Sequence, residues 1–316
     1  MGALQLKPRV ARPHPAQGAP GPGKRVPGTR PATAATTTRR RVAGDERWIG
    51  GLTYLALLVG GITMLVPFAF MLSTSLKPPT QVLLIPPEWI PRPIRWVNYA
   101  EALDVLGWRT FLNTIFFTTS IVLGQGLVTT MGGYGFTRLR FPGREPLFLA
   151  YLGTMMIPSQ VTMIPAYIVV VTLNWHDTYA GMIVPILASG AFGTFLFRQF
   201  FKQLPDELAD AAVIDGANHL TIYWRIYLPL SRPAMTAYGV ITALTAWNMY
   251  IWPLIIVKSP ELWVLTLALS ILSGTMANDF HILMAGVTLS TMPLLVLYLF
   301  GQRYFVQGVT MSGLKG

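Results

Sequence analysis

Six long runs almost free of acidic and basic side chains constrain this chain more than any other feature of its sequence. Only one of them contains charged residues, Arg198 and Lys202. About 20 residues of α-helix cross the hydrocarbon core of a membrane, so each run is long enough to span it. A helix also pairs its own backbone polar groups, which lipid cannot do. The sequence therefore predicts an all-α polytopic membrane protein with six transmembrane helices, over residues 48–76, 110–137, 146–176, 178–205, 233–257 and 282–302.

The composition supports this fold class. Charged residues make up 12% of the chain, which is about half of what a soluble domain carries. A seventh uncharged stretch, residues 262–278, is shorter than a span and contains several Ser, Thr and Asn side chains. We expect it to form a short extracytoplasmic or re-entrant element.

Much of the positive charge lies ahead of the first apolar run. Ten of the 24 Lys and Arg residues fall in the first 47 positions, in a segment rich in Pro, Gly, Ala and Thr. Such a segment cannot bury enough apolar surface to fold. We therefore expect a disordered basic tail at residues 1–46 and a membrane domain at 47–316. A nucleic-acid-binding protein would spread its basic residues over a folded surface, so no nucleic-acid partner is expected.

The tail also contains a near-match to a phosphate-binding loop, at residues 18–24. The next residue is Arg25, where Ser or Thr is needed to hold magnesium, and no predicted strand precedes the segment. We attribute this match to chance, so the chain is not expected to bind a nucleotide there.

The distribution of the cations predicts the orientation of the chain. With the N-terminus inside, 19 Lys and Arg residues lie on the cytoplasmic side and five lie outside. Positively charged loops stay in the cytoplasm in most membrane proteins. Both termini are therefore expected to be cytoplasmic.

The connection at about residues 203–232 is longer than a simple turn requires and has a helical pattern of its own. Pro205 suits a first helical position, and acidic residues at 206 and 207 suit the positive end of the helix dipole. Leu208, Ala212 and Val213 recur at helical spacing and leave a face of small residues. This predicts a first short helix.

A second short helix is expected to follow. Gly216 can adopt the left-handed conformation that ends a helix, and a helical segment can then run over about residues 220–227 until Pro229 ends it. The two helices would form an elbow on the cytoplasmic surface.

Two roles suit this elbow: resting on lipid headgroups and docking a protein partner. Its first helix is acidic, and the anionic inner leaflet of a membrane repels acidic segments. A protein with a basic, groove-like surface is therefore the favoured partner.

Several other activities are disfavoured by the spans themselves. A transporter coupled to protons or sodium would normally carry ionisable groups at membrane depth, and the cores of these runs contain none. No histidine lies in the core of a span and no pair of carboxylates lies within one, so neither a catalytic nor a metal site is expected.

The elbow resembles the EAA motif of the permease subunits of bacterial ABC importers. In that motif Glu-Ala-Ala is followed after three residues by Gly, and after nine more by Ile-x-Leu-Pro. The matching residues here are Asp210, Ala211, Ala212, Gly216, Ile226, Leu228 and Pro229. The chain departs from the motif at its first position, where Asp replaces Glu and shortens the side chain by one methylene.

Other segments narrow the resemblance to the MalG-like carbohydrate permeases, and it covers nearly all of residues 50–316. These segments are Ser75-Leu76-Lys77-Pro78-Pro79, Asn98-Tyr99, Met156-Ile157-Pro158, Ala246-Trp247-Asn248, Trp252-Pro253-Leu254, residues 302–308 and the terminal Lys315-Gly316. Two features depart from this family. Met249 stands where many members carry an acidic residue, and the basic tail is longer than usual.

The resemblance implies the transmembrane domain of a type I ABC importer in the bacterial cytoplasmic membrane, with residues 47–316 as the permease domain. The expected solute is a sugar or oligosaccharide, and a non-sugar solute such as glycerol phosphate, a peptide or a polyamine is the alternative. The implied partners are a homologous MalF-like permease subunit, a dimer of ATP-binding subunits and an extracytoplasmic solute-binding protein. ATP and Mg²⁺ would bind to the ATPase, so this chain is expected to bind no cofactor and to be no enzyme.

The resemblance also implies roles for individual residues. The expected ATPase-coupling residues are Glu207, Asp210, Ala211, Ala212, Asp215, Gly216, Ile226, Leu228 and Pro229. A path for the solute is suggested by Trp247, Asn248, Tyr250 and Trp252, because aromatic faces and an amide suit a sugar. The alternative, which we favour, is that these aromatic residues belong to the belt at the membrane interface.

Overall fold

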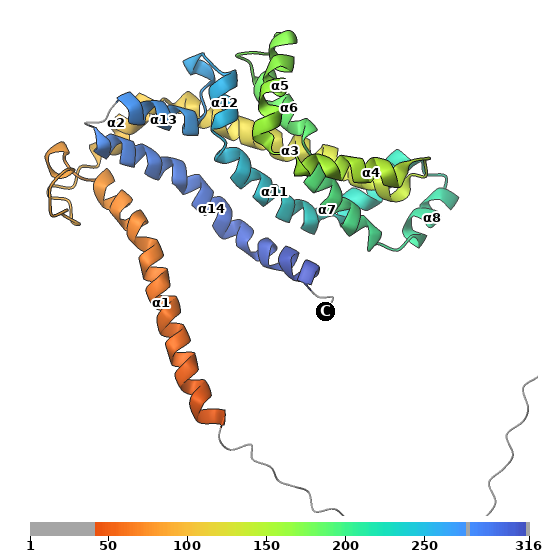
Figure 1. The fold of residues 1–316 in the computed structure, drawn as a ribbon, viewed down its shortest axis with the longest axis horizontal. Helices are drawn as coiled ribbons and strands as arrows, with labels where there is room; N and C mark the ends of the chain where they lie inside the picture. The colour runs from red at the N-terminus through yellow and green to blue at the C-terminus, as the bar shows by residue number, and fades with distance from the viewer. Residues whose placement is uncertain (1–41, 276–278, 314–316) are drawn as a thin grey trace, which may run out of the picture. The chain divides into compact units, whose positions relative to one another are not determined.

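The computed structural model describes residues 42–275 and 279–313, and within these ranges the chain is helical and contains no strand (Figure 1). The elements in chain order are α1 (Val42–Ser75), η1 (Pro79–Gln81), α2 (Val97–Leu106), α3 (Trp108–Arg138), α4 (Arg144–Gly153), η2 (Thr154–Met156), α5 (Ser159–Thr172), α6 (Tyr179–Ala188), α7 (Ala191–Lys202), α8 (Glu207–Ile214), α9 (His219–Ile222), η3 (Tyr223–Tyr227), α10 (Leu228–Leu230), α11 (Arg232–Trp247), α12 (Ile251–Ile256), η4 (Pro260–Leu262), α13 (Leu265–Thr275) and α14 (Phe280–Gly313).

The chain divides into two compact units, residues 1–59 and 60–316. The described part of the first unit is the beginning of α1. Residues 1–41 hold most of the predicted tail and lie outside the described residues. α1 begins at Val42, within the last positions assigned to that tail.

Three helices are long and apolar enough to cross a membrane without a break: Gly50–Ser75 of α1, α3, and Phe280–Gln302 of α14. Two further predicted spans are bent pairs, by 102° where α4 and η2 meet α5 and by 46° where α6 meets α7. The predicted span at 233–257 is α11, which has 16 residues, followed after a break by α12. By length and composition the described residues provide up to five spans, so the predicted count of six is not confirmed.

The breaks have local causes. Pro158 is the N-cap residue of α5, and Ile157 before it is extended. A proline disfavours the helical conformation of the preceding residue and cannot donate to the preceding turn, so the helix stops there. Between α6 and α7, Ser189 and Gly190 leave the helical conformation. An uncharged run predicts that a segment suits the membrane, but it does not predict that the segment is straight.

α3 is the helix around which much of the second unit packs, with α6, α7 and α11 against it (Figure 1). Glycines on α3 permit a close approach to α7. A Cβ atom at Gly133 would lie 2.7 Å from the Cβ atom of Phe197, and one at Gly132 would lie 3.0 Å from Oγ1 of Thr194. Close contact through small residues is typical of helix packing in membranes.

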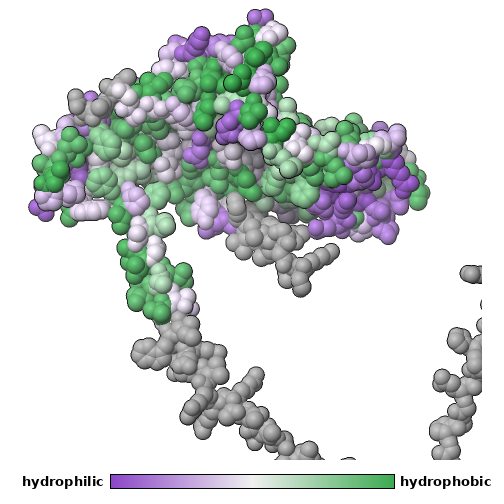
Figure 2. Space-filling model, viewed as in Figure 1, coloured by the Kyte–Doolittle hydropathy of each residue, from purple (hydrophilic) through white to green (hydrophobic). Residues whose placement is uncertain are grey.

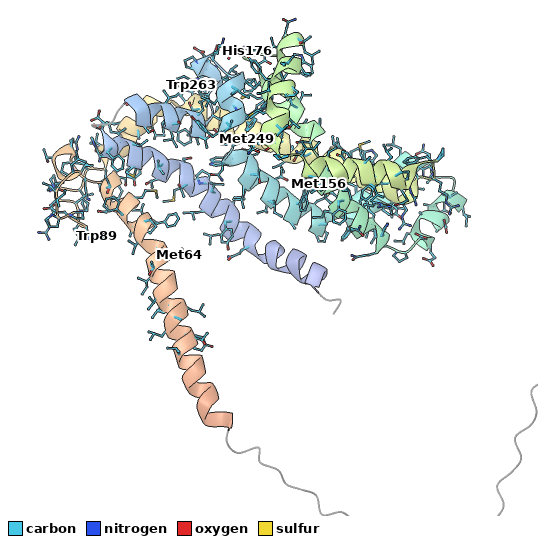
Figure 3. All side chains as sticks on the ribbon, viewed as in Figure 1. Met64, Trp89, Met156, His176, Met249 and Trp263 are labelled. Atoms are coloured by element: carbon cyan, nitrogen blue, oxygen red, sulfur yellow. The ribbon has the colours of Figure 1, made fainter. Side chains whose placement is uncertain are left out.

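The segment between α1 and α2 is held by side chains rather than by regular structure. The amide group of Asn98 donates to the carbonyl oxygens of Ser75 and Lys77, at 2.9 Å each. Lys77 is fully buried, and its ammonium group lies 5.1 Å from the ring centre of Phe70. Trp89, labelled in Figure 3, meets the same ring edge-on. Burial lowers the pKa of Lys77, and the nearby carboxylate of Glu88 opposes this effect.

The uncharged stretch at 262–278 contains the short helix α13, of 11 residues. Its polar side chains bind the break between α11 and α12: the hydroxyl of Thr266 donates to the carbonyl of Met249 at 2.7 Å, and that of Ser270 donates to the hydroxyl of Tyr250 at 3.0 Å. A helix of this length is too short to span a membrane. This agrees with the predicted short element, and its side of the membrane stays a prediction.

Candidate functional site

The elbow of residues 203–232 begins with α8. Asp206 is the N-cap residue of this helix, so Pro205 stands before the cap rather than at the predicted first helical position. Glu207 and Asp210 lie in the first turn, where the positive end of the helix dipole stabilises carboxylates. Asp215 follows the last helical residue.

A tight turn joins the two halves of the elbow. Gly216 has φ +80°, and its N–H donates to the carbonyl of Val213 at 3.0 Å. The N–H of Ala217 donates to the carbonyl of Ala212 at 2.9 Å. These two bonds form a Schellman motif, which confirms the predicted left-handed stop. Asn218 then caps α9, because its side-chain oxygen accepts from the N–H of Thr221 at 2.8 Å.

The second half of the elbow does not end at Pro229, so that prediction was wrong. α9, η3 and α10 follow one another to Leu230, and α11 begins at Arg232. η3 is a π-helical turn in which the N–H of Leu228 donates to the carbonyl of Tyr223. A proline in an α-helix lacks a donor and clashes with the carbonyl four residues earlier. A local π-type adjustment allows the helix to continue past it.

The inner face of the elbow packs on an aromatic cluster that we call the tyrosine cluster. It consists of Tyr134, Phe197, Phe201, Ile222, Tyr223, Tyr227 and Tyr238. Ala209 and Ala212 of α8 and Ala217 of the turn pack against it, and so do Ile226 and Leu228. The motif alanine at 212 is therefore a packing residue whose small size lets α8 lie close to the aromatic rings.

The outer face of α8 combines exposed apolar and acidic side chains. Leu208, Val213 and Ile214 are exposed, Ile214 by 85%. The sequence predicted that Leu208, Ala212 and Val213 recur on one face of the helix. In the structure, only Ala212 of these three faces inward. Ala211 and the acidic residues Glu207, Asp210 and Asp215 are exposed as well. Figure 2 shows hydrophilic side chains gathered at the end of the second unit that carries α8 in Figure 1.

None of these three carboxylates forms an ion pair within the part of the chain that the structure describes. An apolar centre with an unpaired acidic rim is the chemical complement of a basic groove with an apolar floor. This is the kind of surface that the sequence assigned to a protein partner.

The last turns of α3 hold the elbow, and sequence reasoning did not identify the residues that do so. The hydroxyl of Tyr134 lies 3.3 Å from Nδ1 of His219, and its ring packs against those of Tyr223 and Tyr227. Arg138 forms an ion pair with Asp206. The four-residue spacing of Tyr134 and Arg138 at the end of a predicted span is the only signal of this contact in the sequence.

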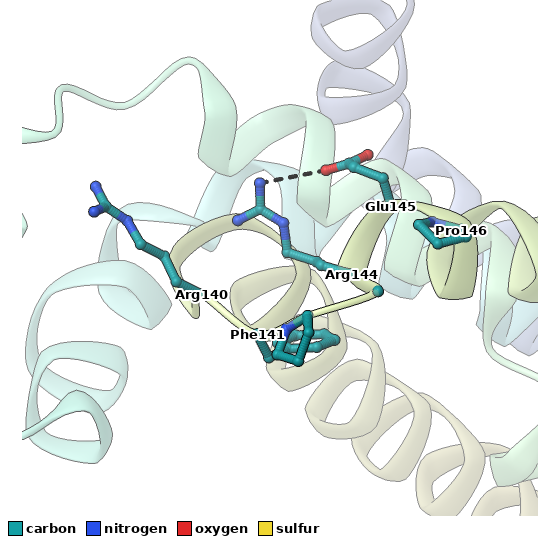
Figure 4. A pocket seen from close by; sticks show the side chains of 7 residues that line it. Arg140, Phe141, Arg144, Glu145 and Pro146 are labelled. Carbon is teal, nitrogen blue, oxygen red and sulfur yellow. Dashed lines mark ion pairs between the residues drawn. The ribbon is translucent and has the colours of Figure 1, made fainter. Parts of the chain in front are cut away.

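The turn between α3 and α4 lies beside this contact and lines a hollow of about 700 Å³ (Figure 4). Nη2 of Arg144 lies 3.3 Å from the carboxylate of Glu145. The same carboxylate accepts from Arg198 at 2.6 Å, and Arg198 is only 4% exposed. One stretch of seven consecutive residues forms the hollow, and its one carboxylate is shared by two guanidinium groups. No ligand is assigned to it.

The four residues proposed for a solute path have three different kinds of contact. The indole of Trp247 is buried and donates to the carbonyl of Ser290 at 3.2 Å, and that of Trp252 donates to the carbonyl of Met182 at 3.1 Å. Tyr250 accepts from Ser270, as described above. Asn248 is exposed and donates to a carbonyl of its own helix. Their role in transport stays a prediction.

Among the residues that the structure describes, no group of three or more His, Asp or Glu side chains could hold a metal ion.

Comparison with known proteins gives consistent matches. The model of the family described as binding-protein-dependent transport system inner membrane component matches residues 126–311, which include the elbow. The arabinooligosaccharides transport system permease protein AraQ of Bacillus subtilis is 32% identical over 269 residues, covering 83% of this chain and 94% of the relative. The sn-glycerol-3-phosphate transport system permease protein UgpE of Escherichia coli O157:H7 is 34% identical over 277 residues, covering 85% and 98%.

A solved structure matches the fold. One chain of a bacterial ABC transporter involved in the import of the acidic polysaccharide alginate superimposes with a TM-score of 0.72 at 25% sequence identity. The match covers 83% of this chain and 98% of that chain.

Proposed function

Because this chain belongs to the family of binding-protein-dependent transport system inner membrane components, it is a permease subunit of an ABC importer, and we propose that its solute is a sugar or oligosaccharide. It is a transport component rather than an enzyme. The names of the AraQ relatives and of the alginate transporter support a carbohydrate. The name of the UgpE relative makes a glycerol phosphate the second candidate.

The observation that carries the proposed mechanism is the outer face of α8. Exposed apolar side chains with a polar rim mark a surface that binds another protein. The family implies a separate ATPase as partner, and the sequence contains no complete phosphate-binding loop. We propose that Asp210 pairs with a basic residue of that ATPase, and that Ile214 and Val213 enter its groove.

Movement of the ATPase would then drive the transport cycle. Closure of an ATPase dimer around ATP displaces the elbow of each permease subunit and shifts the helices between inward-open and outward-open arrangements. This is a two-state equilibrium in which the ATPase binds one arrangement more tightly than the other. The Schellman turn at Gly216 keeps the elbow rigid enough to transmit the displacement.

The family implies an ATPase and a solute-binding protein as partners. It also implies that this chain is a multi-pass protein of the inner membrane. We propose a finer assembly with one homologous MalF-like permease subunit and two ATPase copies. Large apolar side chains exposed on α3, such as Leu112, Phe116 and Leu123, support a surface that faces lipid or that second permease. The bias of 19 cations against five supports cytoplasmic termini.

For the solute path, we propose that Asn248 contacts the solute and that Trp247, Tyr250 and Trp252 form the wall behind it. The indoles of Trp247 and Trp252 bind carbonyls of other helices, which favours this role over the interfacial belt. The exposed amide of Asn248 supports this division, because an amide both donates to and accepts from sugar hydroxyls.

Crosslinking tests the docking of the ATPase. The chain has no native cysteine, so Ile214→Cys introduces a unique thiol on the outer face of α8. Labelled with a photoactivatable maleimide in membranes of the source cells, it should capture an ATP-binding ABC subunit, which mass spectrometry identifies. Leu83→Cys is the matched control, because Leu83 is also an exposed aliphatic residue, at 79%, and lies on the predicted opposite side.

Capture of the ATPase by Ile214→Cys alone supports the proposal. If the Ile214→Cys probe captures no ATP-hydrolysing subunit in membranes where the chain is abundant, the elbow is not the ATPase-docking element.

A further inference from the structure

Arg138 is the last residue of α3, and its side chain is only 12% exposed. Its Nη2 atom donates to the carbonyl of Phe201 at 3.0 Å and to that of Leu204 at 2.8 Å. Its Nη1 atom pairs with the carboxylate of Asp206, the N-cap residue of α8. One guanidinium group thus joins the end of α3 to the end of α7 and to the start of the elbow.

The same side chain also reaches the other half of the elbow. The guanidinium carbon of Arg138 lies 5.1 Å from the ring centre of Tyr227 in η3. Phe201 lies in the last turn of α7 and Leu204 lies two residues after the helix ends, a region in which few backbone donors remain for the carbonyl groups. An arginine has a planar fork of five donors and can bind all these groups at once, whereas a lysine cannot.

Arg138 is the end of a continuous stripe on α3. Thr130 and Tyr134 lie two turns and one turn before it, on the same face. The hydroxyl of Thr130 lies 2.8 Å from that of Tyr223, and Tyr134 contacts His219 and Tyr227 as described above. The stripe is about 12 Å long, at 1.5 Å per residue. It contacts the elbow at the start of α8, at the start of α9 and along η3.

The end of α3 is in turn locked to α7. The space beside Gly133 is filled, because a Cβ atom there would lie 2.9 Å from the backbone nitrogen of Arg198. The guanidinium of Arg198 donates to the carbonyl of Phe136 at 3.2 Å. Tightly packed helices transmit strain to one another, so a displacement that reaches the end of α3 through the elbow is passed on along the α3–α7 interface. The elbow is covalently joined to α7 and α11 only. Its contact with α3 therefore depends on the side chains of Thr130, Tyr134 and Arg138.

We propose that Arg138 is a positioning residue that transmits the displacement of the elbow to α3, an inference that rests on the proposed function. Without it, the ATPase would still dock on the outer face of α8, but the elbow would keep only the contacts of Thr130 and Tyr134 with α3 and would move α3 less effectively. ATP would be hydrolysed with less solute transported per ATP.

The test compares variants of the full importer in proteoliposomes. Arg138→Ala removes all the contacts, Arg138→Lys keeps the charge but loses the fork, and Arg140→Ala is the control, since Arg140 is an exposed arginine two residues further on. Radiolabelled arabinotriose and sn-glycerol 3-phosphate are the uptake probes. The readout is solute transported per ATP hydrolysed, which does not depend on how much complex assembles.

Arg138→Ala should lower this ratio about tenfold or more, since charge-assisted hydrogen bonds are lost. Arg138→Lys should lower it less, and Arg140→Ala should leave it within about twofold of the parent chain. Crosslinking through Ile214→Cys should survive in all three. An unchanged ratio in Arg138→Ala overturns the inference. If Arg138→Ala does not assemble, the ratio in Arg138→Lys decides, and a value equal to that of the parent also overturns it.

A second measurement separates this inference from the proposed function. Hydrogen–deuterium exchange of residues 206–218 in the purified full chain should be faster in Arg138→Ala than in the parent, with exchange in α13 unchanged. Equal exchange in the elbow overturns the inference whether or not an ATPase binds. Failure of the parent chain itself to capture an ATPase counts against the proposed function instead.

Discussion

Polar side chains that reach across the sequence hold the connections between helices in place. On α3, the amide group of Asn113 donates to the carbonyls of Glu261 and Trp263, at 2.8 and 3.0 Å, and its oxygen accepts from the hydroxyl of Tyr179 at 2.7 Å. The backbone carbonyls of an irregular segment need partners when they are buried. The amide group of Asn113 thus provides the hydrogen bonds that backbone N–H groups provide within a regular helix.

Asp177 does the same for the turn before α6. Its carboxylate accepts from the backbone N–H groups of Lys258 and Ser259, at 2.8 and 2.9 Å, and from the hydroxyl of Ser259 at 2.5 Å. The hydroxyl bond first, and then the backbone bonds, hold the pKa of Asp177 below its ordinary value. This carboxylate therefore ties the 174–178 turn to the segment after α12.

We predict that Asp177→Asn destabilises the chain at neutral pH and that this effect fades in acid. A carboxyl group with a lowered pKa in the folded state stabilises above its ordinary pKa of about 3.9, and the contribution is lost as the pH falls through the lowered value. Thermal unfolding of the purified chain between pH 7 and pH 3 measures this. Asparagine tolerates the left-handed conformation of this position, φ 58°, so backbone strain does not obscure the result.

Asp104→Asn is the matched control, because Asp104 is exposed and takes part in no ion pair within the described residues. It should change the unfolding temperature little at any of these pH values. A difference between Asp177→Asn and the parent that stays constant from pH 7 to pH 3 contradicts the proposed role of the charge.

At the scale of elements, the elbow is the clearest case of a structure specified by local rules. The Schellman turn at Gly216 ends α8, and the side chain of Asn218 caps the start of α9. Each of these rules depends on residues within a few positions of one another. The position of the elbow on the tyrosine cluster depends instead on α3 and α7, which are distant in the sequence.

We predict that Gly216→Val abolishes ATP-driven uptake while the chain still inserts in the membrane. A Cβ atom at this position would meet no atom within 4 Å, so the cost is conformational rather than steric. A non-glycine residue in the left-handed region costs about 1–2 kcal/mol, and more for a β-branched one. The turn would therefore open and misplace the outer face of α8. Uptake of labelled arabinotriose or sn-glycerol 3-phosphate by proteoliposomes is the measurement.

Gly216→Asn is the informative companion, since asparagine visits the left-handed region readily. It should retain most of the uptake. Normal uptake by Gly216→Val would mean that the elbow does not need the Schellman turn to transmit force.

The whole molecule is built as part of a larger assembly. Large apolar side chains are exposed along α3, α5 and α14, as with Ile115, Ile164 and Leu299. Such a surface is unfavourable in water and suits lipid or a homologous subunit. Selectivity for the solute is then expected to lie largely in the solute-binding protein that delivers it.

We predict that the solute-binding protein recovered with this importer binds an oligosaccharide, with arabinotriose as the probe, rather than sn-glycerol 3-phosphate. Calorimetric titration of that protein with each compound measures the preference, and a second titration at higher salt is the control. A phosphate ligand held by cationic side chains should lose affinity as salt rises, whereas a neutral sugar should not. Preferential binding of sn-glycerol 3-phosphate would assign the second candidate solute instead.

The spanning helices and the turn of the elbow follow from the order and composition of the amino-acid sequence alone. The uncharged runs predicted α1, α3 and α14 as spanning helices, because the hydrocarbon core selects directly for length and apolarity. The spacing of residues 210–229 predicted the left-handed glycine at 216, because turn chemistry is local. The outward direction of Leu208 and Val213 was not predicted, since a short helix with apolar residues on two sides has no unique inner face until a neighbour is present.

Contacts between distant segments required the folded chain. Arg138 binds carbonyls 63 and 66 positions away, and Asn113 binds others 148 and 150 positions away, with no pattern in the sequence that pairs them. Near the break between α6 and α7, the amide of Gln125 on α3 likewise donates to the carbonyl of Ile186, 61 positions away, at 2.7 Å. Membrane affinity and turn type are properties of a segment and can be read from it, whereas the partner of a polar side chain depends on which helices pack together, and that is a property of the whole fold.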